Sequence, residues 1–267
     1  MFKKKHHQKQ FNRCGDLDQA WFNLQTWYQT PLGKSVADCE RQLVTESVAD
    51  LFGYHLLQVG RLNEANWLSG SRVSHCEVMD FPPANLTMNT RGFQGVPESL
   101  PIQTDSMDVI VLPHVLEFSQ QPHAVLREVE RVLIPEGHVL MLVFNPWSNW
   151  LMWRWLLGWR KCVPWCGRFL STTRIKDWLA LLGFDIVKVK GYYYRPPVKR
   201  QAILERLQFW ETAGQRLWPI FGAANLIVAR KRVVTVTPIR ERWRPKTKIV
   251  ATGLVEPFQQ HQKRDKL

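Results

Sequence analysis

The sequence stretch that decides the fold is DSMDVIVLPHVLEF at residues 105–118, with its continuation LREVERVLIPEG at residues 126–137. Residues 109–112 form a continuous apolar run bounded by acidic and proline residues, which is typical of a strand covered on both faces. Apolar residues then recur at spacings of three and four with charged residues between them, which predicts a one-sided helix. Residues 139–144 predict the next buried strand. Together these segments predict a βαβ unit.

The limits of this unit also follow from the sequence. Pro122 stands where the first turn of the helix should begin, and the Pro-Glu-Gly run at residues 135–137 should end it. Ligands of open parallel sheets bind at the carboxyl ends of the strands, so the loop at residues 114–118 is the first candidate for a ligand-binding or catalytic segment. Periodicity alone fits a generic α/β unit without a catalytic role equally well.

The order of residues in this unit resembles class I S-adenosylmethionine-dependent methyltransferases of the small-molecule type, with a type 11 domain. In that family a strand of the form FDVVV is followed by HVLEH, then LRE, then RVLKPGG. The resemblance covers residues 35–232. It implies a Rossmann-like α/β fold whose seven-stranded, mostly parallel sheet has the order 3-2-1-4-5-7-6, one antiparallel strand and helices on both faces. It also implies S-adenosylmethionine as cofactor and an unidentified acceptor, a small molecule.

Other segments fit the same fold. A helix is expected from about residue 35 to 52, ending at Gly53, and a crossover helix at residues 174–182. Further strands are expected at residues 54–60, 184–190 and 225–231. Residues 61–96 lack a clean period and hold only a candidate helix at 67–68 and a candidate strand at 73–79. The resemblance makes the last two strands the reversed pair of the sheet.

The resemblance also assigns the cofactor to residues at strand ends. The predicted cofactor-binding residues are Gly60, Arg61, Val96, Pro97, Pro113 and His114. Only the first glycine of the usual three is present after the first strand, and the acid that contacts the adenine amine in the family is replaced by the Val-Pro pair. Glu77 or Asp80 is a candidate for the acid that binds the ribose hydroxyls.

Two residues are candidates for catalysis. His114 could act as a general base, because the unperturbed pKa of histidine lies near neutrality. The alternative is a loop histidine that only caps the helix or bonds a backbone carbonyl. Asn145 follows the next strand and is expected to face the acceptor, although the Asn-Pro-Trp run lacks the second proline of amino-methylating DNA enzymes. Methyl transfer depends mainly on alignment, so a missing acid–base dyad does not exclude it.

The net charge of +13 is confined to the two ends of the chain. Residues 1–13 carry five basic residues and no acid, and residues 230–267 carry eleven basic residues against three acids. The body between them is neutral. Such ends can bind the phosphates of nucleic acid or an anionic membrane surface, or they can simply keep a neutral body soluble.

Three expected regions follow from these observations. Residues 1–34 form a basic arm with an aromatic segment, residues 35–232 the methyltransferase-like domain, and residues 233–267 a weakly ordered basic tail. A tryptophan-rich insertion near residues 147–170 is too interrupted by polar residues to cross a membrane, so it is expected either to form a lid over a substrate pocket or to bind at a membrane interface.

The cysteines and the start of the chain indicate the compartment. Five scattered cysteines do not predict a disulfide framework, and Cys162 and Cys166 have no second pair at zinc-ligand spacing, so no metal is expected. The first residues lack the apolar segment of a signal peptide, so a cytoplasmic protein is expected.

Two functions therefore remain open. The first is a methyltransferase that uses S-adenosylmethionine, and the second is a catalytically silent scaffold of the same fold that binds nucleic acid or a membrane surface through its basic tails. The segment at residues 105–146 retains the motifs of the family and favours the first function, and the incomplete glycine loop favours the second.

Overall fold

The structure is a computed structural model of the 267-residue chain. It describes residues 17–63, 67–68, 70–81, 92–148, 150, 153, 163–197, 214, 216, 218 and 221–232. All of these lie in one compact unit, Met1–Val233. The predicted basic arm and basic tail lie outside the described residues, as does half of the predicted tryptophan-rich insertion.

A single seven-stranded sheet with the order β3-β2-β1-β4-β5-β7-β6 forms the centre of this unit. Its strands are β1 (His55–Val59), β2 (His75–Asp80), β3 (Gly92–Gln94), β4 (Met107–Pro113), β5 (Leu133–Phe144), β6 (Phe184–Tyr192) and β7 (Ala224–Lys231). The first five are parallel, and β7 runs antiparallel to both β5 and β6. The predicted fold class is confirmed, including the order of the strands.

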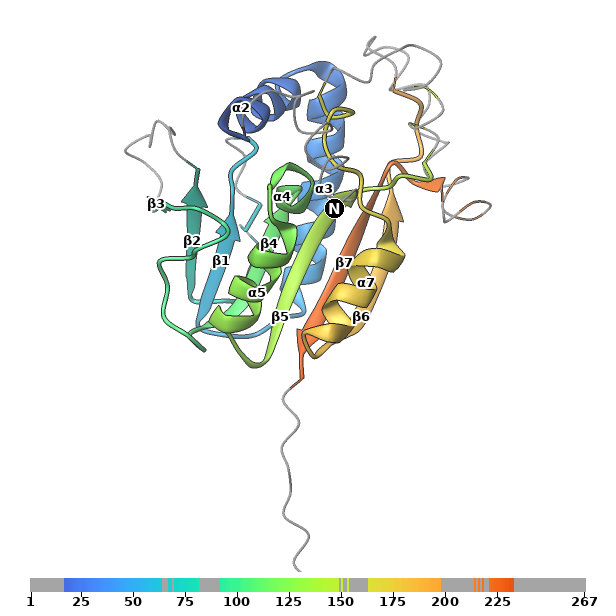
Figure 1. The fold of residues 1–267 in the computed structure, drawn as a ribbon. Coiled ribbons are helices and arrows are strands. Elements are labelled where there is room, and N and C mark those ends of the chain that lie inside the picture. Colours follow the sequence, from blue (N-terminus) through green and yellow to red (C-terminus); the bar gives the residue numbers. More distant parts are fainter. Residues whose placement is uncertain are drawn as a thin grey trace, which may run out of the picture. The chain divides into compact units, whose positions relative to one another are not determined.

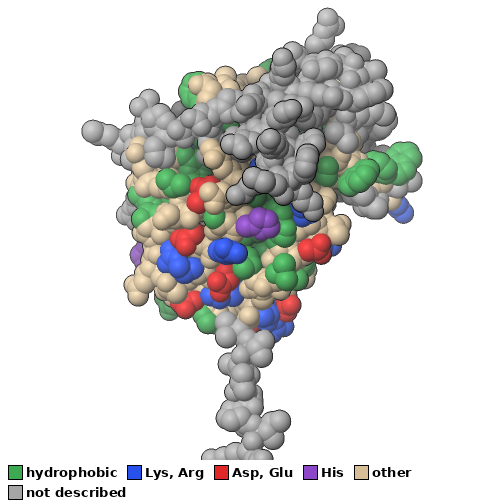
Figure 2. Space-filling model, viewed as in Figure 1, with side chains coloured by type: hydrophobic (Ala, Val, Ile, Leu, Met, Phe, Trp, Pro, Cys, Tyr) green, Lys and Arg blue, Asp and Glu red, His purple; other side chains and the backbone are tan. Residues whose placement is uncertain are grey.

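The helices cover both faces of the sheet. They are α2 (Leu17–Tyr28), α3 (Pro31–Ala49), α4 (Val115–Phe118), α5 (Pro122–Val132) and α7 (Thr172–Leu181). In Figure 1, α5 and α7 lie on the near face, α3 lies on the far face, and α2 passes over the carboxyl ends of β1 and β2. In the same view, Figure 2 shows acidic and basic side chains mixed on the near face, with a histidine beside hydrophobic side chains.

The central strands bury nearly all their side chains. Residues 109–112 of β4 and 139–144 of β5 are each at most 1% exposed, as expected for strands between two helical layers. In α5 the apolar residues Val125, Leu126 and Val129 are buried against the sheet while Arg127 is exposed. The predicted βαβ unit is confirmed, although the helix ends at Val132, three residues before the expected Pro-Glu-Gly stop.

The N-terminal helices differ from the prediction. Helix α3 begins at Pro31, about four residues before the expected start, because Thr30 caps it by accepting a hydrogen bond from the backbone N–H of Gly33. The aromatic cluster at residues 21–28 forms helix α2, which the sequence analysis had not predicted. Trp21, Leu24 and Tyr28 of this helix are all buried, at helical spacings of three and four.

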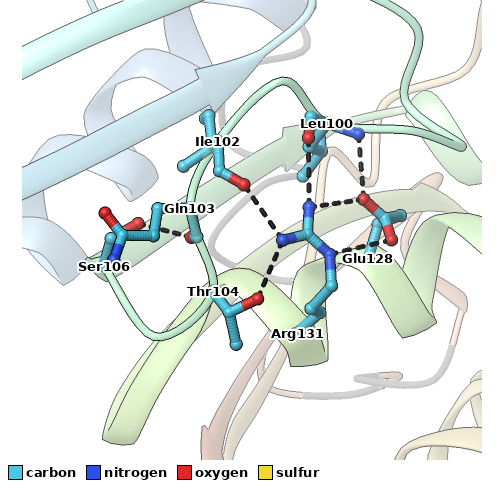
Figure 3. A network of polar contacts seen from close by, with 7 residues as sticks. All are labelled: Leu100, Ile102, Gln103, Thr104, Ser106, Glu128 and Arg131. Carbon is cyan, nitrogen blue, oxygen red and sulfur yellow. Dashed lines mark hydrogen bonds and ion pairs between the residues drawn. The ribbon is translucent and has the colours of Figure 1, made fainter.

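Glu128 of the LRE motif and Arg131, one turn further along α5, hold the chain that leads into β4. The Arg131 guanidinium donates to the carbonyls of Leu100 and Ile102 and to the hydroxyl of Thr104, and it pairs with Glu128 at 2.7 Å (Figure 3). Glu128 in turn accepts from the backbone N–H of Leu100. This arginine therefore fixes the loop before β4 to α5.

Two further observations concern membranes and cysteines. None of the described helices combines the length and the apolar character that crossing a bilayer requires. Cys39 and Cys76 are reduced cysteines, but Cys166 is disulfide-bonded, which the sequence did not predict.

Candidate active site

The carboxyl ends of β1 and β2 place a glycine and an acid side by side. Gly60 directly follows β1, and its N–H donates to the carbonyl of Met79 at 2.7 Å. Its φ of +85° lies in the left-handed region, which side chains disfavour. Asp80 is the last residue of β2 and is 5% exposed. A glycine turn and a carboxylate therefore meet at the edge where α/β sheets bind ligands.

The position of Asp80 distinguishes it from the other candidate acid. Glu77 lies in the middle of β2 with an exposed side chain, whereas Asp80 ends the strand beside Gly60. The Asp80 carboxylate lies 3.2 Å from the guanidinium of Arg61. Burial raises the pKa of Asp80 above its ordinary value, although the charge of Arg61 opposes this effect. Of the two acids, Asp80 is the one placed to contact a ligand at this edge.

An aromatic ring covers the backbone of Gly60. A Cβ atom at this position would lie 2.6 Å from the Trp21 ring and 3.1 Å from the Phe81 ring. Trp21 packs edge-on against Phe81 at 4.6 Å and against Phe118 at 6.5 Å between ring centroids. Helix α2 therefore closes the glycine turn, and Trp21 is only 5% exposed.

The remaining predicted cofactor residues lie at the same edge. The N–H of Gly95, which follows β3, donates to the carbonyl of Asp80 at 3.0 Å, and this brings the next residues, Val96 and Pro97, to the end of β2. Val96 is 50% exposed, while Pro97 is buried. Pro113 is the last residue of β4, the neighbour of β1. The structure thus brings the predicted cofactor residues together along four adjacent strand ends.

His114 lies at the centre of a buried charged network. It adopts a left-handed conformation, with φ of 55°, between β4 and α4, and it is 0% exposed. Its Nε2 lies 2.9 Å from Oε1 of Glu40, and its Nδ1 lies 3.2 Å from Oε1 of Glu117. Its ring stacks on Phe144 at 3.9 Å. Both ring nitrogens are bound to carboxylates, so in this arrangement neither is available to a substrate.

Glu40 joins this network to two other elements of the fold. It lies on α3 and is 0% exposed. Its Oε2 accepts from the Tyr28 hydroxyl of α2 and its Oε1 from the Tyr192 hydroxyl of β6, each at 2.8 Å. Burial, together with the charge of Glu40, raises the pKa values of both phenols well above their ordinary range. Both tyrosines therefore remain neutral donors to Glu40.

The two carboxylates keep His114 charged. Burial disfavours the imidazolium, but Glu40 and Glu117 outweigh this effect and raise the pKa of His114 to about 9. The ordinary value is 6.5. Because the pKa of His114 is higher in the folded than in the unfolded state, protonation of its imidazole stabilises the folded state. This stabilisation is fully present below pH 6.5 and is lost as the pH rises through about 9.

We therefore expect the free energy of unfolding to fall between pH 6.5 and about pH 9. The pKa values of His123 and His138 are lowered, chiefly by burial and by nearby arginines, so these groups titrate below this window. Urea denaturation at several pH values, compared with His114→Gln, measures the effect. The variant should show a flatter profile than the parent protein; parallel profiles would mean that His114 is not charged in the folded state.

Asn145 is held by the backbone around it. Its Nδ2 donates to the carbonyl of Gly222 at 3.0 Å, its Oδ1 accepts from the N–H of Trp147 at 3.0 Å, and it is 4% exposed. Its own N–H donates to the carbonyl of Ala223. The amide thus fixes the turn after β5 against the segment that enters β7.

Sequence reasoning missed two parts of this site. Glu40 lies between Val36 and Leu43 at helical spacing, and all three are buried, so a charged residue inside the apolar stripe was a detectable signal. Trp21 gave no comparable signal of a contact with Gly60, because the two residues are far apart in the sequence and meet only in the folded chain.

Comparisons with known proteins agree with this geometry. A family model described as "Methyltransferase domain" matches residues 59–141, from the end of β1 into β5. The uncharacterized protein YafS of Escherichia coli (strain K12) is 29% identical over 219 residues, which is 79% of this chain and 82% of that protein.

Solved structures share the fold. A S-adenosylmethionine-dependent methyltransferase of Thermotoga maritima superposes with a TM-score of 0.57 at 16% identity, over 79% of this chain and 99% of that one. A candidate S-adenosylmethionine-dependent methyltransferase of Listeria monocytogenes gives a TM-score of 0.52 at 14% identity, over 74% and 98%.

The strand order defines a Rossmann-like fold, and its glycine turn and acid lie at adjacent strand ends on the edge where such sheets bind ligands. The family match over the central unit narrows this class further. Residues 59–141 match the methyltransferase-domain family model, and the described chain shares the fold of S-adenosylmethionine-dependent methyltransferases; both findings support the superfamily predicted from the sequence.

Proposed function

We propose that the protein transfers a methyl group from S-adenosylmethionine to a small-molecule acceptor at the carboxyl edge of its sheet. The observation that carries this proposal is the meeting of Gly60 and Asp80 at the ends of β1 and β2, inside the family-matched fold. When bound, S-adenosylmethionine supplies an electrophilic methyl group on its sulfonium. The family match supports this enzyme class and this cofactor.

The residues at the edge suit a nucleoside with vicinal hydroxyls. Gly60 has no side chain and lets a ligand approach the backbone, and the Asp80 carboxylate can accept hydrogen bonds from ribose hydroxyls. The Trp21 ring fills the space beside Gly60, so binding requires that this ring move. Arg61 is paired with Asp80 and must share or release the carboxylate.

Other residues support the site by holding its loops. Methyl transfer by in-line displacement depends on approach and alignment, so fixed loops matter more than an acid–base pair. His114, bound by Glu40 and Glu117, fixes the turn after β4. Asn145 fixes the turn after β5. In this proposal both are positioning residues, and the general-base role predicted for His114 would require a rearrangement that frees one of its ring nitrogens.

We expect Asp80→Asn to weaken S-adenosylmethionine binding by about 10- to 100-fold, the range that corresponds to losing a hydrogen bond to a charged acceptor. Isothermal titration calorimetry with S-adenosylmethionine and with S-adenosylhomocysteine measures this. Glu77→Gln is the matched control, because Glu77 belongs to the same strand but is exposed. It should leave the affinity unchanged.

Two outcomes would contradict the proposal. If the parent protein gives no binding heat at millimolar ligand, S-adenosylmethionine is not its cofactor. If the two variants bind with equal affinity, Asp80 does not contact the cofactor. The scaffold alternative gains no support from the family match. Binding of nucleic acid or an anionic membrane through the basic ends remains a prediction, because both ends lie outside the described residues.

A further inference from the structure

Basic side chains without acidic partners gather where α5 and α7 begin. We call this group the arginine patch; it comprises His123, Arg127, Arg168 and Arg174. Within the part of the chain that the structure describes, none of the three guanidinium groups forms an ion pair, and Nε of Arg168 is buried without a hydrogen-bond partner. By contrast, Arg131 is paired with an acid.

Contacts around Trp178 define the centre of the patch. The His123 and Trp178 rings lie 3.9 Å apart, and the Arg174 guanidinium lies 5.6 Å from the centroid of the Trp178 ring. Arg127 is one turn after His123 in α5 and therefore shares its face. His123, Arg127 and Arg174 are exposed, and Arg168 is partly buried.

The charges in the patch repel one another. Burial, with the charges of Arg127, Arg174 and Arg168, lowers the pKa of His123, and burial with the charge of Arg174 lowers that of Arg168. The helices add to the positive potential: α5, of 11 residues, and α7, of 10 residues, both begin here with no acid in the first turn. A bound anion would relieve this repulsion.

The patch adjoins the candidate cofactor site. The N–H of Arg168 donates to the carbonyl of Glu117 at 2.9 Å, and a Cβ at Gly167 would lie 3.1 Å from the Phe118 ring. Phe118 in turn contacts Trp21, which covers Gly60. Both α5 and α7 follow strands of the sheet, so their N-termini lie at its carboxyl edge, and both helices lie on the near face in Figure 1.

We propose that the arginine patch binds the anionic group, a phosphate or a carboxylate, of the methyl acceptor. Guanidinium groups present paired donors whose geometry matches both kinds of anion. An acceptor held there would extend from the patch along the carboxyl edge toward the methyl donor. The assignment rests on the proposed function, and it narrows the acceptor to an anionic small molecule.

Calorimetry on the full chain at low salt tests this, with inorganic pyrophosphate and succinate as separate probes. We expect the parent protein to bind at least one probe, and the better probe indicates whether the anion is a phosphate or a carboxylate. The double variant Arg168→Gln/Arg174→Gln should bind it about tenfold more weakly or worse. Lys176→Gln is the matched control, since Lys176 is exposed two residues further along α7 and points to another side of the helix.

The outcomes separate this proposal from the proposed function. The proposal that the arginine patch binds an anion would be wrong if the double variant and the control bound the probe with equal affinity. It would also be wrong if the parent protein bound neither probe. S-adenosylmethionine binding is measured on the same variants and should be unchanged. If the protein binds S-adenosylmethionine but neither anion, only the proposal that the arginine patch binds an anion is wrong. If it binds an anion but not S-adenosylmethionine, the anion site has no connection to a methyl acceptor.

Discussion

Replacing Glu40 with alanine is expected to lower the free energy of unfolding by about 3–5 kcal/mol, the usual cost of removing one partner from a buried charged pair. The variant would leave the His114 imidazolium 0% exposed with only Glu117 beside it. It would also leave the buried hydroxyls of Tyr28 and Tyr192 without their acceptor. Urea denaturation followed by circular dichroism measures the change.

Glu46→Ala is the matched control for this prediction. Glu46 lies on the same helix, and its side chain is 50% exposed. Its carboxylate accepts a hydrogen bond from the Gln42 side chain at 2.9 Å and lies 3.9 Å from the Lys190 ammonium group. An exposed pair of this kind contributes little, so the control should change stability by less than about 1 kcal/mol. If both variants unfold at the same urea concentration, the network around His114 does not stabilise the fold.

Replacing Trp21 with alanine should have two opposite effects. Stability should fall by about 3–5 kcal/mol, as is usual when a buried aromatic side chain is removed. The affinity for S-adenosylmethionine should rise by about tenfold, because a ligand at Gly60 no longer has to displace the ring from Phe81 and Phe118, and each aromatic pair contributes about 0.5–1.5 kcal/mol.

Calorimetry and urea denaturation on the same samples measure both effects. Trp147→Ala is the control, because the Trp147 side chain is 69% exposed and should affect neither quantity strongly. Weaker binding by the Trp21 variant would identify the ring as a wall of the site. Unchanged binding would mean that the ligand does not pass over Gly60.

The sequence predicted the sheet well because its signals are local. Residues 109–112 and 139–144 are apolar without interruption, and the structure buries both as neighbouring strands. The second strand was only a candidate, since β2 alternates between exposed and partly buried residues and becomes fully buried only at its end. For the same reason the sequence could not choose between Glu77 and Asp80.

The candidate site was harder to predict because its contacts are remote in the sequence. His114 could be placed after β4 from the motif, but its two carboxylate partners depend on how α3 and α4 pack. Glu40 and His114 are 74 residues apart, and Glu40 and Tyr192 are 152 apart. The periodicity of a sequence does not show which distant residues meet in the folded chain. For this reason His114 was predicted as a general base, whereas the structure places it at the centre of a buried charged network.

The span of that network has a consequence for dissecting the protein. The segment matched by the family model, residues 59–141, contains His114 and Glu117 but neither Glu40 nor Tyr192. A fragment cut to that segment would expose β4 and β5 on one side and leave an imidazole without its nearest counter-charge. Autonomous folding therefore needs both flanks, and nascent chains complete their polar centre only after Tyr192 has been synthesised.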